Sequence, residues 1–317
     1  MHGKRVTARV GLRFSLSFGL FAGLTLCSPA AHAGLVNFCD KDQHLSPGQQ
    51  DLLFSFAGLI KAELERSGVS SALLARSGLN LSRFDQRYSH AGISLKASEN
   101  GPWSVRQLYY ACDEKRPRIF DQGMAGFVLG ADNPKHSFIS VLLLPPDATQ
   151  AMSQSAADKR LALASLGPTY SANAYAFSTR YQNCNQWLIE LLALAWGGPF
   201  DAAGQNPREQ AQRWLRLQNY RPTPIHAGPL ADFAALIPWL HTDDHPEQDL
   251  RERRFQISMP TAIEAFVHAR YPATQRLEFC RRGREVVIRR GWTPLPEDCS
   301  AEGDDEHVLL SQTRNLN

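Results

Sequence analysis

The sequence predicts an α+β fold in which an antiparallel sheet packs against helices. Apolar residues at spacings of three and four predict an amphipathic helix over residues 47–66, with Ser46 as its cap and Pro47 in its first turn. Residues 87–95 and 103–112 are rich in apolar and aromatic residues and flank a turn with Gly, Pro and Asn, so we expect a β-hairpin. A second apolar helix is expected to begin at Cys184, with Asn183 as its cap. Hairpins and separate helices in one chain are typical of the α+β class.

Shorter patterns predict the remaining elements. The apolar run at residues 136–144 ends at two prolines, which suits a central strand. Residues 275–299 alternate around Gly283, as in a hairpin. Residues 71–78 are too few to distinguish a helix from a strand by their period. Further helices are expected at residues 151–167 and 206–218, and a strand that turns into a helix at residues 253–272.

Residues 1–33 have the layout of a secretory signal peptide. Four basic residues precede an apolar run over residues 14–27, and Ala31-His32-Ala33 offers a cleavage site. A lipoprotein would need a small residue before Cys27, where this chain has Leu26, so we expect cleavage after residue 33 and no lipid anchor. The mature protein is therefore expected to cross the inner membrane and to reside in the periplasm.

Net charge and hydropathy argue against two classes of protein. Without residues 1–33, which carry four Lys or Arg and no acidic residue, the formal net charge changes from +3 to −1. A near-neutral chain gives no electrostatic case for nucleic-acid binding. After the signal segment, no apolar run reaches the roughly 18 residues that a transmembrane helix needs. The remaining chain is long enough for one large domain or two smaller ones.

The mature chain has an odd number of cysteines. Cysteines of exported proteins meet an oxidising environment and are normally paired. One cysteine is therefore unpaired by accident, bonded to another molecule, or kept free because its thiol does chemistry. The five cysteines are Cys39, Cys112, Cys184, Cys280 and Cys299.

Cys184 and His90 have the surroundings of a nucleophile and its base. The start of a helix carries partial positive charge and free N–H groups, which stabilise a thiolate and an oxyanion. His90 lies on an expected strand beside the small pair Ala91-Gly92, and counting across the hairpin places Gln107 next to it. A buried inert thiol or half-cystine at position 184 and a satisfied core histidine at position 90 are the structural alternatives.

Two motifs carry a resemblance to known families. The strand with "YSHAGI" (residues 88–93), a polar residue on the next strand and "YQNCNQWLIELL" (residues 181–192) opening a later helix resemble the permuted NlpC-type branch of the papain fold. This branch includes relatives of lecithin:retinol acyltransferase, and in it the histidine strand precedes the cysteine helix, as here. With its signal peptide and C-terminal cysteine hairpin, the whole mature chain resembles more closely an uncharacterised bacterial family, domain of unknown function 2145.

The resemblance implies a permuted papain-like fold, in which the antiparallel sheet that carries the histidine packs on the helix with the cysteine at its N-terminus. It implies Cys184 as the nucleophile, His90 as the general base and Gln107 as the residue that orients the imidazole. Gln107 departs from the pattern, because relatives often have a histidine or an acid there. An amide orients an imidazole but stabilises its charged form less than a carboxylate does.

A free Cys184 leaves four cysteines that can pair in three ways. Proximity in sequence favours a Cys280–Cys299 disulfide, which leaves Cys39 with Cys112. The expected organisation is a signal peptide at residues 1–33, a papain-like domain at residues 34–275, a cysteine-flanked β-hairpin at residues 276–300 and an acidic flexible tail at residues 301–317.

Other charged segments are expected to be structural. His241, Asp243, Asp244 and His245 lack the fixed spacing of a zinc site, so we expect a solvated loop there and neither a metal nor another cofactor. The arginines of residues 281–290 are expected to be exposed charge on a hairpin.

The sequence leads to two functional hypotheses. The first is an exported thiol hydrolase or acyltransferase that cleaves an amide or ester through an acyl-cysteine intermediate. Cell-wall peptides are its natural periplasmic substrate, and the acyltransferase relatives suggest lipid acyl chains instead. The second is a papain-like module that binds an envelope partner without turnover, for which Gln107 is the main support.

Overall fold

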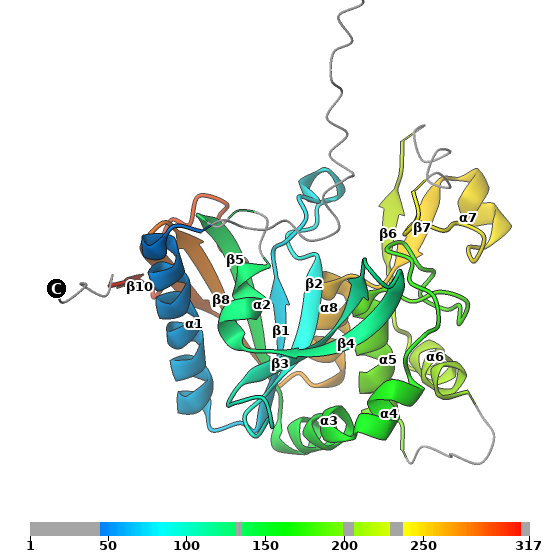
Figure 1. The fold of residues 1–317 in the computed structure, drawn as a ribbon, viewed down its shortest axis with the longest axis horizontal. Helices are drawn as coiled ribbons and strands as arrows, with labels where there is room; N and C mark the ends of the chain where they lie inside the picture. The colour runs from blue at the N-terminus through cyan, green and yellow to red at the C-terminus, as the bar shows by residue number, and fades with distance from the viewer. Residues whose placement is uncertain (1–44, 131–132, 134, 199–205, 229–236, 312–317) are drawn as a thin grey trace, which may run out of the picture. The chain divides into compact units, whose positions relative to one another are not determined.

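The computed structural model describes residues 45–130, 133, 135–198, 206–228 and 237–311 (Figure 1). These residues belong to one compact unit. The expected signal peptide and Cys39 lie outside them. No helix of the described part is long and apolar enough to cross a membrane.

An antiparallel sheet of eight strands organises the described residues. The strand order is β10-β9-β8-β5-β1-β2-β3-β4. The fold is therefore mixed α and β with a large antiparallel sheet, as expected, and β6 (Thr223–His226) and β7 (Arg254–Ile257) form a separate two-stranded sheet. The strands of the large sheet are β1 (Ser71–Arg76), β2 (His90–Leu95), β3 (Ser104–Ala111), β4 (Arg116–Gln122), β5 (His136–Leu143), β8 (Gln275–Arg282), β9 (Glu285–Arg290) and β10 (Glu306–Leu309).

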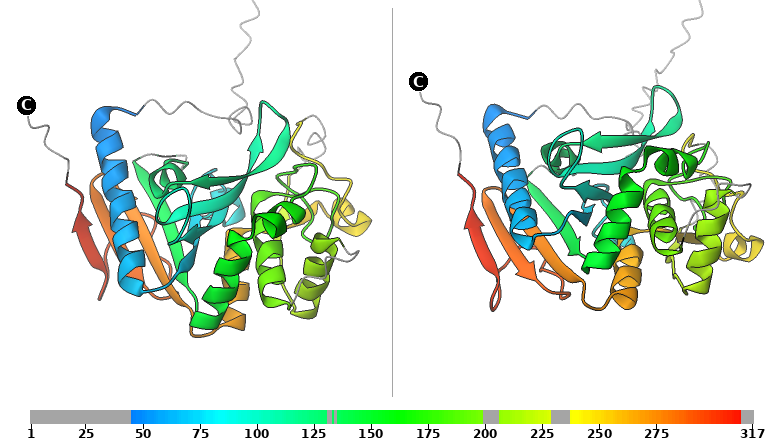
Figure 2. Two further views of the ribbon diagram at one scale, coloured as in Figure 1. Left: turned by 60° about the horizontal axis from the view of Figure 1, so that its bottom comes forward. Right: turned by 90° about the horizontal axis from the view of Figure 1, so that it is seen from below.

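Helices cover both faces of the sheet (Figure 2). On one face, α1 and α2 share a core with strand residues such as Leu74 and Ile139. On the other, α3 packs against α5, and the α3 carbonyl of Ala156 accepts a hydrogen bond from Arg106 of β3. The helices are α1 (Pro47–Ser67), α2 (Met124–Leu129), α3 (Pro146–Ala157), α4 (Lys159–Ala164), α5 (Cys184–Trp196), α6 (Pro207–Leu217), α7 (Glu247–Arg251) and α8 (Pro260–Arg270).

Local chemistry explains where the two principal helices begin and end. Ser46 and Gln49 form a reciprocal capping box at the start of α1, and Gly68 ends the helix in the left-handed region at φ 74°. Asn183 caps α5, since its side chain accepts from the Gln186 N–H at 2.7 Å. The sequence predicted both starts from the caps Ser46 and Asn183.

Two predicted elements differ in detail. The helix expected at residues 151–167 is divided into α3 and α4, because the side chain of Asp158 accepts from the N–H groups of Arg160 and Leu161 and so starts a new helix. The ambiguous segment at residues 71–78 forms β1, which is buried on both sides. A buried strand shows no alternation of apolar and polar residues, so its period could not identify it.

The C-terminal hairpin is part of the main sheet. β8 pairs with β5 along its whole length and with β9 on its other side. In the segment expected to be a tail, Glu306–Leu309 form β10 and pair with β9. The segment at residues 276–300 therefore extends the sheet that carries His90.

Two charged segments are less exposed than the sequence suggested. The expected solvated loop at His241 to His245 is wrong in part, because the His245 ring is buried and bonds the Asn173 carbonyl at 2.8 Å, while Asp244 accepts from the Tyr175 N–H. Of the hairpin arginines, Arg281 and Arg289 are buried, and Arg289 pairs with Asp305 at 2.6 Å.

Candidate functional site

Cys184 is the first residue of α5, and within the described part of the chain its thiol is free. Four N–H groups at a helix start lack partners inside the helix. The Gln186 N–H bonds the Asn183 side chain and the Trp187 N–H bonds the Asn183 carbonyl. The N–H groups of Cys184 and Asn185 face the thiol and act to lower its pKa. Two backbone donors and the sulfur therefore occupy one place, which is the arrangement that stabilises a thiolate or an oxyanion.

The thiol nevertheless lies in a poorly hydrated environment. Burial raises the pKa of Cys184 to about 11, against the lowering effects of the Arg76 charge, the backbone donors and the Tyr170 hydroxyl. Burial, followed by the neighbouring Cys184, also raises the pKa of Tyr170 well above its ordinary value, so Tyr170 remains a neutral donor to sulfur. The thiolate expected from the helix start alone is thus not the resting form at neutral pH.

His90 and Gln107 are in contact, as expected. The His90 Nε2 and the Gln107 Oε1 lie 2.7 Å apart. The amide of Gln107 is oriented by a second bond, in which its Nε2 donates to Gln122 Oε1 at 2.8 Å. Because the Gln107 oxygen can only accept, Nε2 of the neutral imidazole carries the proton and Nδ1 keeps its lone pair. Nδ1 is the nitrogen that a general base needs.

The imidazole of His90 is enclosed by aromatic rings. Its ring stacks on Tyr109 at a centroid distance of 4.8 Å, and Phe127 lies 6.2 Å away. Burial and, after it, the Arg76 charge lower the pKa of His90 to about 3, although the Gln107 bond acts to raise it. His90 is therefore neutral throughout the physiological pH range.

The pairing of β2 with β3 differs from the predicted register. Position 107 was expected opposite position 90, which would place Ile93 opposite Ser104, whereas Ile93 pairs with Arg106. The Gln107 side chain therefore reaches His90 diagonally, and Tyr109 is the residue that stacks on the ring. Diagonal neighbours in a sheet are within reach of long side chains. The predicted register is two residues out because it assumed a shorter turn between the two strands than the fold has.

Cys184 and His90 lie at the same end of the sheet. Register pairs His90 with Arg76, and so places it on the face of Leu74, which α1 and α2 cover. The start of α5 is held at the same end by a bond of 3.1 Å from the Asn185 side chain to the Ser89 carbonyl. Asn185 follows the cysteine and Ser89 precedes the histidine. Among the hydrogen bonds of the described residues, none joins the Cys184 thiol to the His90 ring.

Arg76 is a buried residue of this site that the sequence analysis did not single out. Its guanidinium donates to Tyr109 Oη at 2.9 Å and to the Gly130 carbonyl. No carboxylate of the described residues pairs with it, and its Nε has no hydrogen-bond partner there. A buried cation without a counter-ion is costly, and such groups concentrate at functional sites. The only signal in the sequence was an arginine at the end of an apolar run.

The disulfide expected in the C-terminal hairpin is present. Cys280 and Cys299 are bonded, with their Cα atoms 5.4 Å apart. Cys112 is also disulfide-bonded, while its predicted partner Cys39 lies outside the described residues. His136 lies beside the Cys280–Cys299 disulfide, but sulfurs in a disulfide are not thiolate ligands, so this group offers no preformed metal site.

These features define an α+β protein with a free cysteine at the start of a buried helix and an amide-oriented histidine on the adjoining sheet. The chain belongs to the family described as "Uncharacterized protein conserved in bacteria (DUF2145)", whose model matches residues 63–267. The matched range contains His90, Gln107 and Cys184 and ends before the disulfide of the hairpin. No curated protein and no solved structure matches the chain.

Proposed function

We propose that this protein is an exported cysteine hydrolase or acyltransferase that cleaves an amide or ester bond through an acyl-cysteine intermediate. The observation that carries the proposal is the free Cys184 thiol at the start of α5, with two backbone N–H donors and the Tyr170 hydroxyl directed at its sulfur. Nucleophile and oxyanion donors then share one place, as acyl transfer requires.

The reaction balances with groups of this chain. The Cys184 Sγ attacks the substrate carbonyl carbon while its proton passes to His90 Nδ1. The oxyanion is stabilised by the N–H groups of Cys184 and Asn185, and collapse breaks the carbon–nitrogen or carbon–oxygen bond as His90 protonates the leaving group. Water, or an acceptor alcohol or amine, then loses a proton to His90 and attacks the thioester, which releases the acyl group and restores the thiol.

In this proposal, Gln107 orients the His90 imidazole. Amide groups serve this purpose in papain-like proteases, where the third residue is an asparagine. The bond to His90 Nε2 leaves Nδ1 as the basic nitrogen, and the bond to Gln122 prevents the amide from turning over. The likeness to the permuted NlpC-type branch of the papain fold remains part of this proposal.

The resting pair is neutral, and the proposal must account for its activation. Separately charging a thiol of pKa about 11 or an imidazole of pKa about 3 is unfavourable at neutral pH. Transfer of one proton from Cys184 to His90 creates both charges together, which attract each other and cost less than either alone. Contacts between catalytic groups are often long in unliganded sites and tighten when substrate binds.

We infer a periplasmic location from the N-terminal segment, and cell-wall peptides as the first substrate class to test. Lipid acyl esters are the alternative substrate. The second candidate function is a non-catalytic envelope-binding module, which the neutral Cys184 and His90 favour.

Bifunctional alkylation tests the pairing of the two residues. 1,3-Dibromoacetone can bridge a thiol and an imidazole that approach within about 5 Å, and peptide mapping should find Cys184 linked to His90. The control variant His226→Gln removes an exposed histidine of β6 and should leave the bridge intact. A Cys184 that is alkylated only once, or bridged elsewhere, would support the binding module.

Acylation by p-nitrophenyl acetate tests the chemistry. Intact mass should show one acetyl group on Cys184, and His90→Gln should slow its formation by about 100-fold or more, as is usual for loss of a general base. Muropeptides and phospholipid vesicles then separate the two substrate classes. An acetylation rate equal to that of free cysteine in wild type and variant would count against an enzyme.

A further inference from the structure

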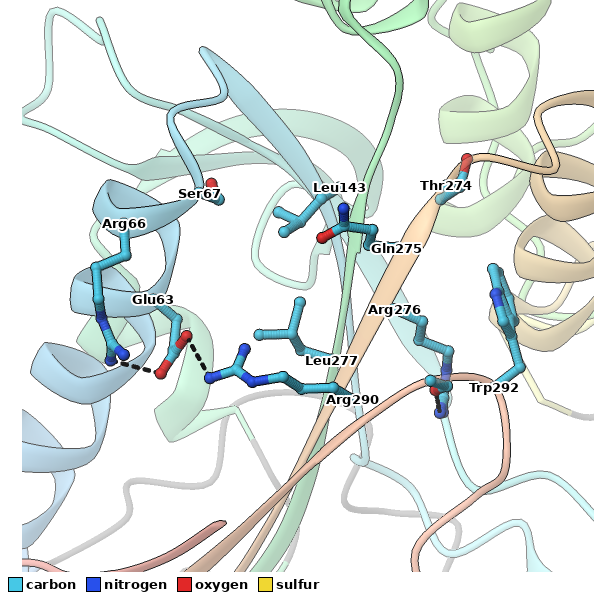
Figure 3. A pocket seen from close by; sticks show the side chains of 11 residues that line it. Glu63, Arg66, Ser67, Leu143, Thr274, Gln275, Arg276, Leu277, Arg290 and Trp292 are labelled. Atoms are coloured by element: carbon cyan, nitrogen blue, oxygen red, sulfur yellow. Dashed lines mark hydrogen bonds and ion pairs between the residues drawn. The ribbon is translucent and has the colours of Figure 1, made fainter. Parts of the chain in front are cut away.

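A pocket at the other end of the sheet is independent of the cysteine site. It has a volume of about 550 Å³ and lies between the end of α1 and the β8–β9 hairpin (Figure 3). Leu143, the last residue of β5, lines it, whereas Arg76 ends the antiparallel neighbour β1 at the opposite end of the strands. This volume is within the range of small-molecule sites.

The pocket combines an apolar floor with a cationic rim. Leu143 and Leu277 form the floor, and Trp292 stands at one side (Figure 3). Arg66 and Arg290 lie on the rim, and both bond the same buried carboxylate, Glu63, at 2.5 and 3.0 Å. Arg290 also contacts Glu306 at 3.3 Å.

The shared glutamate holds the two guanidinium groups near each other with donors to spare. Each guanidinium carries five N–H donors, and Arg66 and Arg290 remain 58% and 52% exposed. With Glu63 and Glu306 the charges of the cluster balance, so what the two arginines offer an incoming carboxylate is their unused N–H donors. The third lining arginine, Arg276, is buried and already paired with Glu264 and Glu278.

We propose that this pocket binds a small carboxylate that carries an apolar aryl or acyl body. The carboxylate would lie between Arg66 and Arg290, where fork-shaped donors bind carboxylates bidentately. The apolar body would cover Leu143 and Leu277 beside Trp292. Binding here requires no chemistry at Cys184.

Two matched probes test the charge requirement. 2-Naphthoate should bind with a Kd below about 1 mM in calorimetry or ligand-observed NMR, and 2-naphthamide, which has the same body without the charge, should bind about tenfold more weakly. Equal binding of the two probes, or no saturable binding up to about 5 mM, would overturn the proposal.

The chain supplies a matched control for the arginines. The double variant Arg66→Gln/Arg290→Gln should weaken naphthoate binding by about tenfold or more and leave naphthamide binding unchanged. Arg116 and Arg118 of β4 are similarly exposed, at 58% and 45%, and also share one carboxylate, Glu114. Their double Gln variant should bind naphthoate like wild type, and equal weakening by both double variants would show nonspecific attraction and refute the pocket.

The double variant leaves the buried Glu63 without its two arginine partners, which could prevent folding. A second variant keeps the test decisive in that case. Ser67→Trp adds bulk at the pocket wall without changing a charge (Figure 3). With folding confirmed by circular dichroism, this variant should weaken both probes by about tenfold, because both need the same space. Unchanged affinity for naphthoate would show that the ligand lies outside the pocket, and would refute the proposal while leaving the proposed cysteine chemistry untouched.

Discussion

Burial of neutral His90 should make the stability of the protein depend on pH. The pKa of His90 is about 3 in the folded protein, against 6.5 for an exposed imidazole. Between these two values the unfolded chain takes up a proton that the folded chain does not, so acid favours unfolding. Stability from this residue is complete above pH 6.5 and is lost as the pH falls toward 3.

The magnitude follows from the size of the shift. Each pH unit inside the window costs about 1.4 kcal/mol of unfolding free energy. From about pH 7.5 to about pH 4.5, His90 should therefore remove about 2.5 kcal/mol. His90→Gln has no titrating group and retains an amide that can bond Gln107, so it should lack this loss.

Urea unfolding at a series of pH values measures the effect. The carboxyl groups with raised pKa, Glu264 and Asp244, titrate in wild type and variant alike, so the difference between the two curves isolates His90. The exposed His226→Gln variant controls for the loss of an imidazole elsewhere. Parallel wild-type and His90→Gln curves, within about 0.5 kcal/mol, would show that His90 accepts a proton in the folded protein and would refute the burial argument.

Three further outcomes are expected. Iodoacetamide should alkylate Cys184 more slowly than free cysteine at about pH 8, with a midpoint near 11, and Arg76→Met should slow it further; a midpoint near that of free cysteine would contradict this. Gln107→Leu should cost about 1–3 kcal/mol in urea unfolding, because it leaves the buried His90 Nε2–H without an acceptor; no loss would mean that water replaces the amide. Gly130→Ala should cost about 1–3 kcal/mol, because its Cβ would lie 2.5 Å from the Arg76 guanidinium, whereas Gly123→Ala meets open space and is the control.

Local patterns predicted most of the fold because each depended on near neighbours in the chain. The starts of α1 and α5 were fixed by Ser46 and Asn183, whose side chains act within one turn. The β8–β9 hairpin followed from alternation around Gly283, which adopts φ 61°. Its membership of the main sheet depends on pairing with β5, more than a hundred residues away, and no local pattern reports that contact.

The candidate site divides in the same way. Cys184, His90 and Gln107 were found from residue type and local context, and the contact of the last two is present. Arg76 and Tyr170 were missed because their importance lies in what surrounds them: a guanidinium without a carboxylate partner among the described residues, and a hydroxyl directed at sulfur. The direction of the Cys184 pKa was also misjudged, since the helix start was counted and the burial of the thiol could not be.

The raised thiol pKa has a consequence for selectivity in the proposed reaction. A thiolate that is always present reacts with any electrophile that reaches it, whereas a neutral thiol reacts only after a base has removed its proton. Here the base, His90, lies beside Arg76, whose positive charge disfavours an imidazolium until negative charge arrives nearby. Formation of the thiolate or the oxyanion supplies that charge. The Arg76 cation therefore stabilises the transition state, although in the resting site it disfavours protonation of His90. Removal of this cation should therefore separate two readouts: Arg76→Met should raise the pKa of His90 toward its ordinary value and yet slow acylation of Cys184. Faster acylation in Arg76→Met would show that Arg76 hinders the reaction by disfavouring protonation of His90, and would remove it from the proposed mechanism.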